Sequence, residues 1–115
     1  MFWYILPAMK IQLLCFDGCP SWETALDNLK TACALEGLMW PIELIEMRDD
    51  DDAAARRFLG SPSIVVSGQD LWPETRQAYH MSCRMYRTPE GLRGWPTVEM
   101  LREKLCALGG EAGGA

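Results

Sequence analysis

The sequence predicts an α/β domain with a mixed four-stranded sheet and the element order β-α-β-α-β-β-α. Three short runs, at residues 11–16, 41–47 and 63–67, have the length and apolar composition of strands. Segments with helical spacing of apolar residues separate these runs. A strand–helix–strand unit requires a parallel pair, whereas a hairpin adds antiparallel strands, so the predicted sheet is mixed.

The first strand, at residues 11–16, ends at the turn residues Asp17 and Gly18. Ser21 is then placed to cap a helix, and Gly37 is placed to end it. One face of this helix is apolar, which predicts that it packs on the sheet. The residues of that face are Trp22, Ala25, Leu26, Leu29, Ala32, Cys33 and Leu35.

Four consecutive aspartates, at residues 49–52, follow the second strand and precede a short helical segment at 53–59. Carboxylates at the start of a helix, basic residues near its end and a glycine after it suit the helix dipole. Gly60 is expected to close this helix. Because no EF-hand spacing follows, the aspartates are interpreted as a solvated helix cap rather than as a metal site.

The run at 63–67 is rich in β-branched residues, and a turn at 68–69 joins it to a short strand around 70–72. Residues 73–96 lack clear periodicity, which predicts a long loop. Loops of this length are unusual in small domains and are often functional.

Thr97 is placed to cap a last helix. Its inward positions are Val98, Leu101, Leu105 and Leu108. The predicted organisation is an N-terminal extension at 1–8, one domain at 9–108 and a flexible glycine-rich tail at 109–115.

Composition narrows the function classes. The 115 residues are 49% hydrophobic and 23% charged, as in a globular protein with one core. The net charge of -5 argues against binding of nucleic acid, which needs a basic face. Five cysteines, an odd number at irregular spacing, indicate at least one free thiol and a cytoplasmic location. The apolar opening is too short for a membrane span, so no membrane partner is expected.

Cys19 is the leading candidate for chemistry, because it lies at the predicted turn from the first strand into the first helix. Unpaired N–H groups and the positive dipole end of a helix favour the thiolate, which is the nucleophile and the ligand for soft metals. Pro62 stands directly before the third predicted strand, where a residue without an N–H fits. The bond from Ser61 to Pro62 is of the type for which cis is common.

These motifs carry a family resemblance. The segments Phe16-Asp17-Gly18-Cys19-Pro20, Gly60-Ser61-Pro62-Ser63-Ile64 and Ser82 to Leu92 resemble those of small bacterial thioredoxin-like proteins with a single cysteine at the helix start. Some members of that group are labelled alkylmercury lyases. The resemblance implies a thioredoxin-like fold, a cis-proline at Pro62 facing Cys19, and no cofactor. It further implies that Pro20, Trp22, Ser61 and Pro62 contact the substrate.

One departure changes the expected chemistry. Dithiol thioredoxins carry a second cysteine three residues after the first, and here that position is Trp22. A resolving thiol must therefore come from elsewhere, or the mechanism uses one thiol. Cys83, in the long loop near Ser82, Arg84 and Arg87, is the preferred partner because cations favour its thiolate.

Three other cysteines and the single histidine are weaker candidates. Cys15 is an alternative partner that reaches Cys19 only if the turn folds back. Cys33 and Cys106 are expected to pack in the core. His80, in the long loop, is a less favoured base or ligand.

Three functions remain open at this point. In the first, Cys19 attacks a disulfide of a protein or a small molecule, and Cys83 or an external thiol resolves it. In the second, Cys19 with Cys83 or Cys15 handles a thiophilic metal or an organomercurial, with Asp17 as the acid, although no resident metal site is recognised. In the third, the domain is a non-catalytic binding module. Exposed sheet edges and the tryptophan-rich loop make a homodimer plausible.

Overall fold

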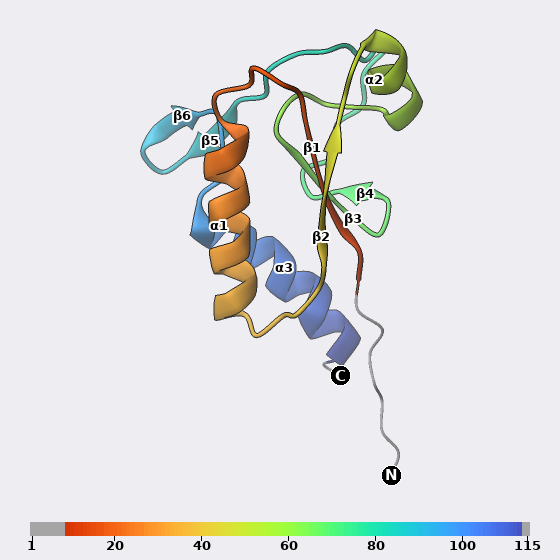
Figure 1. Cartoon of the computed structure of the whole chain (residues 1–115). Coiled ribbons are helices and arrows are strands. Elements are labelled where there is room, and N and C mark those ends of the chain that lie inside the picture. Colours follow the sequence, from red (N-terminus) through yellow and green to blue (C-terminus); the bar gives the residue numbers. More distant parts are fainter. Residues whose placement is uncertain (1–8, 114–115) are drawn as a thin grey trace.

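A computed structural model describes residues 9–113 and places them in three helices and two sheets (Figure 1). The segment 1–8 lies outside the described residues, so the boundary at residue 9 stays a prediction. None of the described helices is long and apolar enough to cross a bilayer. The helices are α1 (Trp22–Leu35), α2 (Asp50–Arg56) and α3 (Val98–Gly113). The strands are β1 (Ile11–Cys15), β2 (Ile42–Glu46), β3 (Ser63–Val66), β4 (Gln69–Asp70), β5 (Tyr86–Thr88) and β6 (Gly91–Arg93).

The main sheet has four strands in the order β2-β1-β3-β4. β1 pairs in parallel with β2 and antiparallel with β3, and β3 pairs antiparallel with β4. Leu13 lies at the centre of this sheet, opposite Leu44 on one side and Ile64 on the other. The predicted mixed four-stranded sheet is therefore confirmed.

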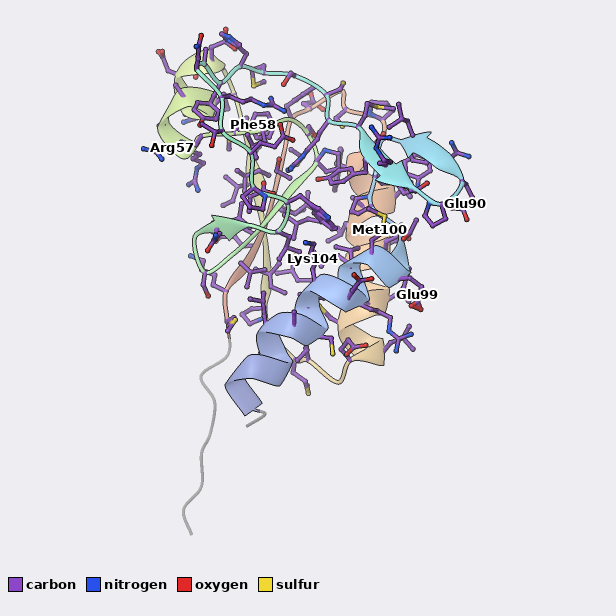
Figure 2. All side chains as sticks on the ribbon, turned by 180° about the vertical axis from the view of Figure 1, so that it is seen from behind. Arg57, Phe58, Glu90, Glu99, Met100 and Lys104 are labelled. Carbon is purple, nitrogen blue, oxygen red and sulfur yellow. The ribbon has the colours of Figure 1, made fainter. Side chains whose placement is uncertain are left out.

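Helices cover both faces of the sheet, and β1 is therefore buried on both of its faces. Ile11, Leu13 and Cys15 point to the core beneath α1 and α3, whereas Leu14 belongs to a second core beside α2. Figure 1 shows α1 and α3 together on one side of the strands, with α2 away from them. In Figure 2, Phe58 points toward the sheet and Arg57 away from the molecule.

The ends of α1 differ from the sequence expectation. Ser21 is the N-cap residue, but its side chain makes no capping hydrogen bond. It packs instead against Gly94, where a Cβ atom would overlap the Ser21 hydroxyl. Leu35, expected on the inward face, is 56% exposed.

The α2 helix begins earlier than expected. The Asp49 carboxylate accepts the N–H of Asp52 at 2.8 Å and the other three aspartates form the first turn, so the interpretation of the aspartates as a helix cap is confirmed. The helix ends at Arg57, whose left-handed backbone (φ 52°) takes the place expected for Gly60.

The sequence predicted a long loop at residues 73–96, but part of this segment is regular structure. It contains the β5–β6 hairpin, in which Tyr86 pairs with Arg93 and Thr88 with Gly91. Two strands of three residues each are too short to show a period, which explains the missing signal. The α3 helix also continues through Gly109 to Gly113, where the sequence predicted a flexible tail.

Arg84 fastens this segment to the main sheet. Its side chain is 3% exposed and donates to Asp70 at 2.8 Å and to the Trp72 carbonyl at 2.6 Å. It also donates to the Ser63 hydroxyl at 3.1 Å, and its guanidinium lies 5.0 Å from the centre of the Tyr86 ring. A buried guanidinium with several acceptors is satisfied only when all of these elements are in place.

We predict that Arg84→Ala lowers the free energy of unfolding by about 3 kcal/mol, because it leaves Asp70 without its charge partner. Urea denaturation measures the change. Arg48→Ala is the control, since it removes an exposed ion pair with Asp52 and should leave the unfolding midpoint unchanged. Equal effects of the two substitutions would contradict the central role of Arg84.

Candidate functional site

Cys19 lies between β1 and α1, two positions before the N-cap residue Ser21. A turn holds it there, because its N–H donates to the Phe16 carbonyl at 3.1 Å. Its side chain is only 6% exposed. The thiol therefore lies just before the helix rather than in its first turn, and it is covered by other residues.

The Cys19 thiol contacts the segment before β3. The Cys19 thiol approaches the Ser61 carbonyl oxygen at 3.8 Å, the distance of a weak S–H donor. The bond between Ser61 and Pro62 is cis, as the sequence analysis expected. Ser61 is 1% exposed, and Pro62 is fully buried. The fold thus brings together the two segments that the sequence analysis singled out.

A second segment lies against the same residue. Ser61 forms an isolated parallel bridge with Cys83. The Ser61 N–H donates to the Ser82 carbonyl at 2.7 Å, and the Ser61 carbonyl accepts the Arg84 N–H at 3.0 Å. The Tyr86 hydroxyl donates to the Pro62 carbonyl at 2.6 Å. Residues 82–84, here called the covering segment, therefore occupy the main-chain edge of Ser61.

The Cys19 thiol and the segment that contains Cys83 contact the same carbonyl group. The Ser61 carbonyl oxygen accepts from the Cys19 thiol and also from the N–H that directly follows Cys83. Cys83 itself is exposed, in contrast to Cys19. The site is a pair of free thiols on two segments, one buried and one at the surface.

The electrostatic surroundings of Cys83 differ from the sequence expectation. Arg84 points into the protein and its charge is paired with Asp70, so it is not a cation for the Cys83 thiol. Arg87, four residues after Cys83, is exposed. The predicted role of Arg84 at Cys83 is therefore wrong, because the guanidinium is needed in the interior.

Cys15 is a third thiol near Cys19. It is 7% exposed, and burial raises its pKa to about 11, with further contributions from Cys19 and Glu46. It lines a cavity of about 270 Å³. The other residues of that cavity are Phe16, Asp17, Trp22, Leu44 and Glu46. A thiol with so high a pKa is a weak nucleophile at neutral pH.

The four predicted substrate contacts fall into two groups. Pro20 is exposed and Trp22 is half-buried, so both can meet another molecule. Ser61 and Pro62 are inaccessible while the covering segment is in place. The Ser61 hydroxyl is buried and has no hydrogen-bond partner in the part of the chain that the structure describes.

Cys33, Cys106 and His80 are the remaining candidates. Cys33 is buried in the core, as predicted, and burial raises its pKa. The prediction that Cys106 packs in the core is wrong, because it is exposed on α3. His80 is exposed, and its carbonyl accepts from the Ser82 hydroxyl at 3.3 Å.

Other features of the described residues do not form a metal centre. Residues 9–113 contain no group of three or more His, Cys, Asp or Glu side chains able to hold a metal ion.

A separate cavity of about 320 Å³ lies between α2 and the β3–β4 hairpin, with Arg57, Ser63 and Tyr79 among its walls. Neither Cys19 nor Cys83 lines it.

Sequence reasoning missed the covering segment, although one signal was present. Gly60 has φ +118°, and a Cβ atom there would lie 2.9 Å from the Arg84 Cβ and 3.0 Å from the Cys83 carbonyl oxygen. A glycine before the Ser61–Pro62 pair can mark a place where another backbone comes close.

No protein-family model, curated protein or solved structure matches the chain, so the functional interpretation depends on the geometry alone.

Gly60→Ala should push the covering segment away from Ser61. The positive φ and the overlap with Arg84 together predict a loss of about 2–4 kcal/mol in unfolding free energy. Labelling of Cys19 by a maleimide should become faster. Gly68→Ala is the matched control, because Gly68 also has a positive φ but open space around it. The covering role is refuted if Cys19 labelling is the same in both variants.

The pKa of Cys15 predicts a pH dependence of stability. The folded thiol titrates near pH 11 and the unfolded thiol near pH 9, so the unfolded state loses its proton first. The contribution of the protonated Cys15 thiol to the free energy of unfolding is complete below pH 9, and it is lost as the pH rises through 11. Urea denaturation between pH 8 and pH 11 should therefore show a smaller fall for Cys15→Ala than for the wild type. Parallel profiles would contradict the raised pKa of Cys15.

Proposed function

We propose that the chain is a thioredoxin-like protein that carries out thiol–disulfide exchange with Cys19 and Cys83 as its redox pair. The strand order β2-β1-β3-β4 supports the fold, together with α1 and α3 on one face and α2 on the other. Pro62 at the start of β3 and Cys19 after β1 occupy the places where thioredoxin-like proteins carry a cis-proline and a reactive thiol.

One observation carries the proposal. Both cysteine segments are held by the same carbonyl oxygen, that of Ser61. A disulfide needs Cα atoms within about 7 Å, so the proposed pair requires the two segments at this carbonyl to bring Cys19 and Cys83 to that separation. Dithiol thioredoxins carry their resolving cysteine at the position of Trp22, and in the proposed pair Cys83 takes over this role.

The proposed reaction transfers two electrons from the dithiol to a substrate disulfide. One protein thiolate attacks a substrate sulfur, and the first substrate thiolate leaves. The second protein thiolate then attacks the mixed disulfide, and the second substrate thiolate leaves. The products are a Cys19–Cys83 disulfide and two substrate thiols, and two external thiols, which become a disulfide, return the protein to its reduced form.

Cys15 is the competing partner, but its raised pKa weakens the case for it. At neutral pH its sulfur carries a proton, and a thiol is a poor nucleophile compared with a thiolate. Cys83 is exposed, so a substrate disulfide can reach its sulfur. The metal-handling and binding-module hypotheses remain predictions.

Mild oxidation followed by mass analysis under non-reducing conditions tests the pair. The experiment uses Cys106→Ser, because the exposed Cys106 would form disulfides between chains. We expect one internal bridge, between Cys19 and Cys83, with Cys15 and Cys33 still reduced. A Cys15–Cys19 bridge, or no internal bridge, would contradict the proposed pair. Cys33→Ser is the control and should leave the bridge unchanged.

A further inference from the structure

We propose that Cys83, rather than Cys19, attacks the substrate disulfide, and that Cys19 completes the exchange. This inference rests on the proposed redox pair and assigns its order of action. It reverses the order expected from the sequence, in which the helix-start cysteine acts first.

Accessibility is the first argument. A substrate disulfide must approach the attacking sulfur in line with the bond that breaks. Cys83 is exposed, whereas Cys19 is 6% exposed. In the arrangement described, a disulfide from outside therefore meets Cys83 first.

The covering segment is the second argument. It uses both main-chain groups of Ser61, with hydrogen bonds of 2.7 Å and 3.0 Å, and it lies against the residue that the Cys19 thiol contacts. A substrate backbone cannot pair with Ser61 while these bonds exist. Attack by Cys19 on a disulfide whose backbone pairs with Ser61 would require both bonds to open.

The buried ion pair makes that opening costly. Arg84, the last residue of the covering segment, is held by Asp70 at 2.8 Å and by the Trp72 carbonyl at 2.6 Å. Because Gly60 has no side chain, Cys83 and Arg84 lie in close contact with the backbone just before β3. Detachment of residues 82–84 thus breaks contacts in the interior and not only at the surface.

The order of events follows from these contacts. The Cys83 thiolate forms a bond to one substrate sulfur, and the other substrate sulfur leaves as a thiolate. Cys19 then loses its proton to solvent or to that leaving thiolate, and its sulfur attacks the Cys83 sulfur. The Cys83–substrate bond breaks, the second substrate thiolate leaves, and the Cys19–Cys83 bond remains. The second step is internal, so the burial of Cys19 does not hinder it.

Single-cysteine replacements in the Cys106→Ser background separate the two roles. The probe is an aromatic nitrothiobenzoate disulfide, whose released thiolate is coloured, and the adducts are located by mass analysis. The parent should release two coloured thiolates per chain and end as the Cys19–Cys83 disulfide. Cys19→Ala should release one at the parental rate and keep the mixed disulfide on Cys83.

Cys83→Ser should slow the first release at least about tenfold, because Cys19 must wait for the covering segment to detach. Cys106 in the otherwise wild-type chain is the internal control. It is exposed but, unlike Cys83, it does not lie beside Ser61, so its adduct should persist.

Two outcomes separate the failure of this order from the failure of the proposed function. If Cys83→Ser reacts at the parental rate with the adduct on Cys19, the order is wrong although the redox pair stands. If the parent forms no Cys19–Cys83 disulfide, the redox pair is wrong, and the order fails with it.

Discussion

The buried guanidinium of Arg84 is the interaction on which the site depends. Burial alone would lower its pKa, but Tyr86, Asp70 and Glu74 raise it, so the charge persists in the interior. A buried charge is tolerated only when its donors are satisfied, and the acceptors here come from β3, β4 and the segment after β4. Residues 73–96 therefore have one arrangement in which Arg84 is satisfied, and that arrangement places Cys83 beside Ser61.

Main-chain groups do the rest of the positioning. The peptide groups of Ser61 bind the covering segment, and the Pro62 carbonyl accepts the Tyr86 hydroxyl. Gly60 is needed because no side chain fits between the two backbones at that point. The segments of Cys19 and Cys83 thus both contact Ser61, through main-chain groups that no sequence motif encodes.

The regular elements could be predicted because their signals are local. The β-branched run of β3 and the buried run of β1 identify strands by composition, and the apolar spacing of α1 identifies a helix. The position of Pro62 followed from its missing N–H. Arg84 was misjudged because an arginine in a polar loop is normally exposed, and only the tertiary structure supplies its acceptors. The prediction for Cys106 was wrong because a free cysteine is usually buried, whereas this one lies on the outer face of α3.

In the proposed redox pair, the position of Cys83 on a segment separate from Cys19 has a thermodynamic consequence. In a motif with both thiols on one turn, the closeness of the sulfurs follows from local geometry. In the proposed redox pair it follows from the packing of residues 73–96, so the effective concentration of Cys83 at Cys19 depends on the free energy that holds this segment. By linkage, a bond between the thiols stabilises the segment by as much as the segment favours the bond. In the proposed cycle, the Arg84 ion pair therefore acts on the redox equilibrium, although it touches neither sulfur.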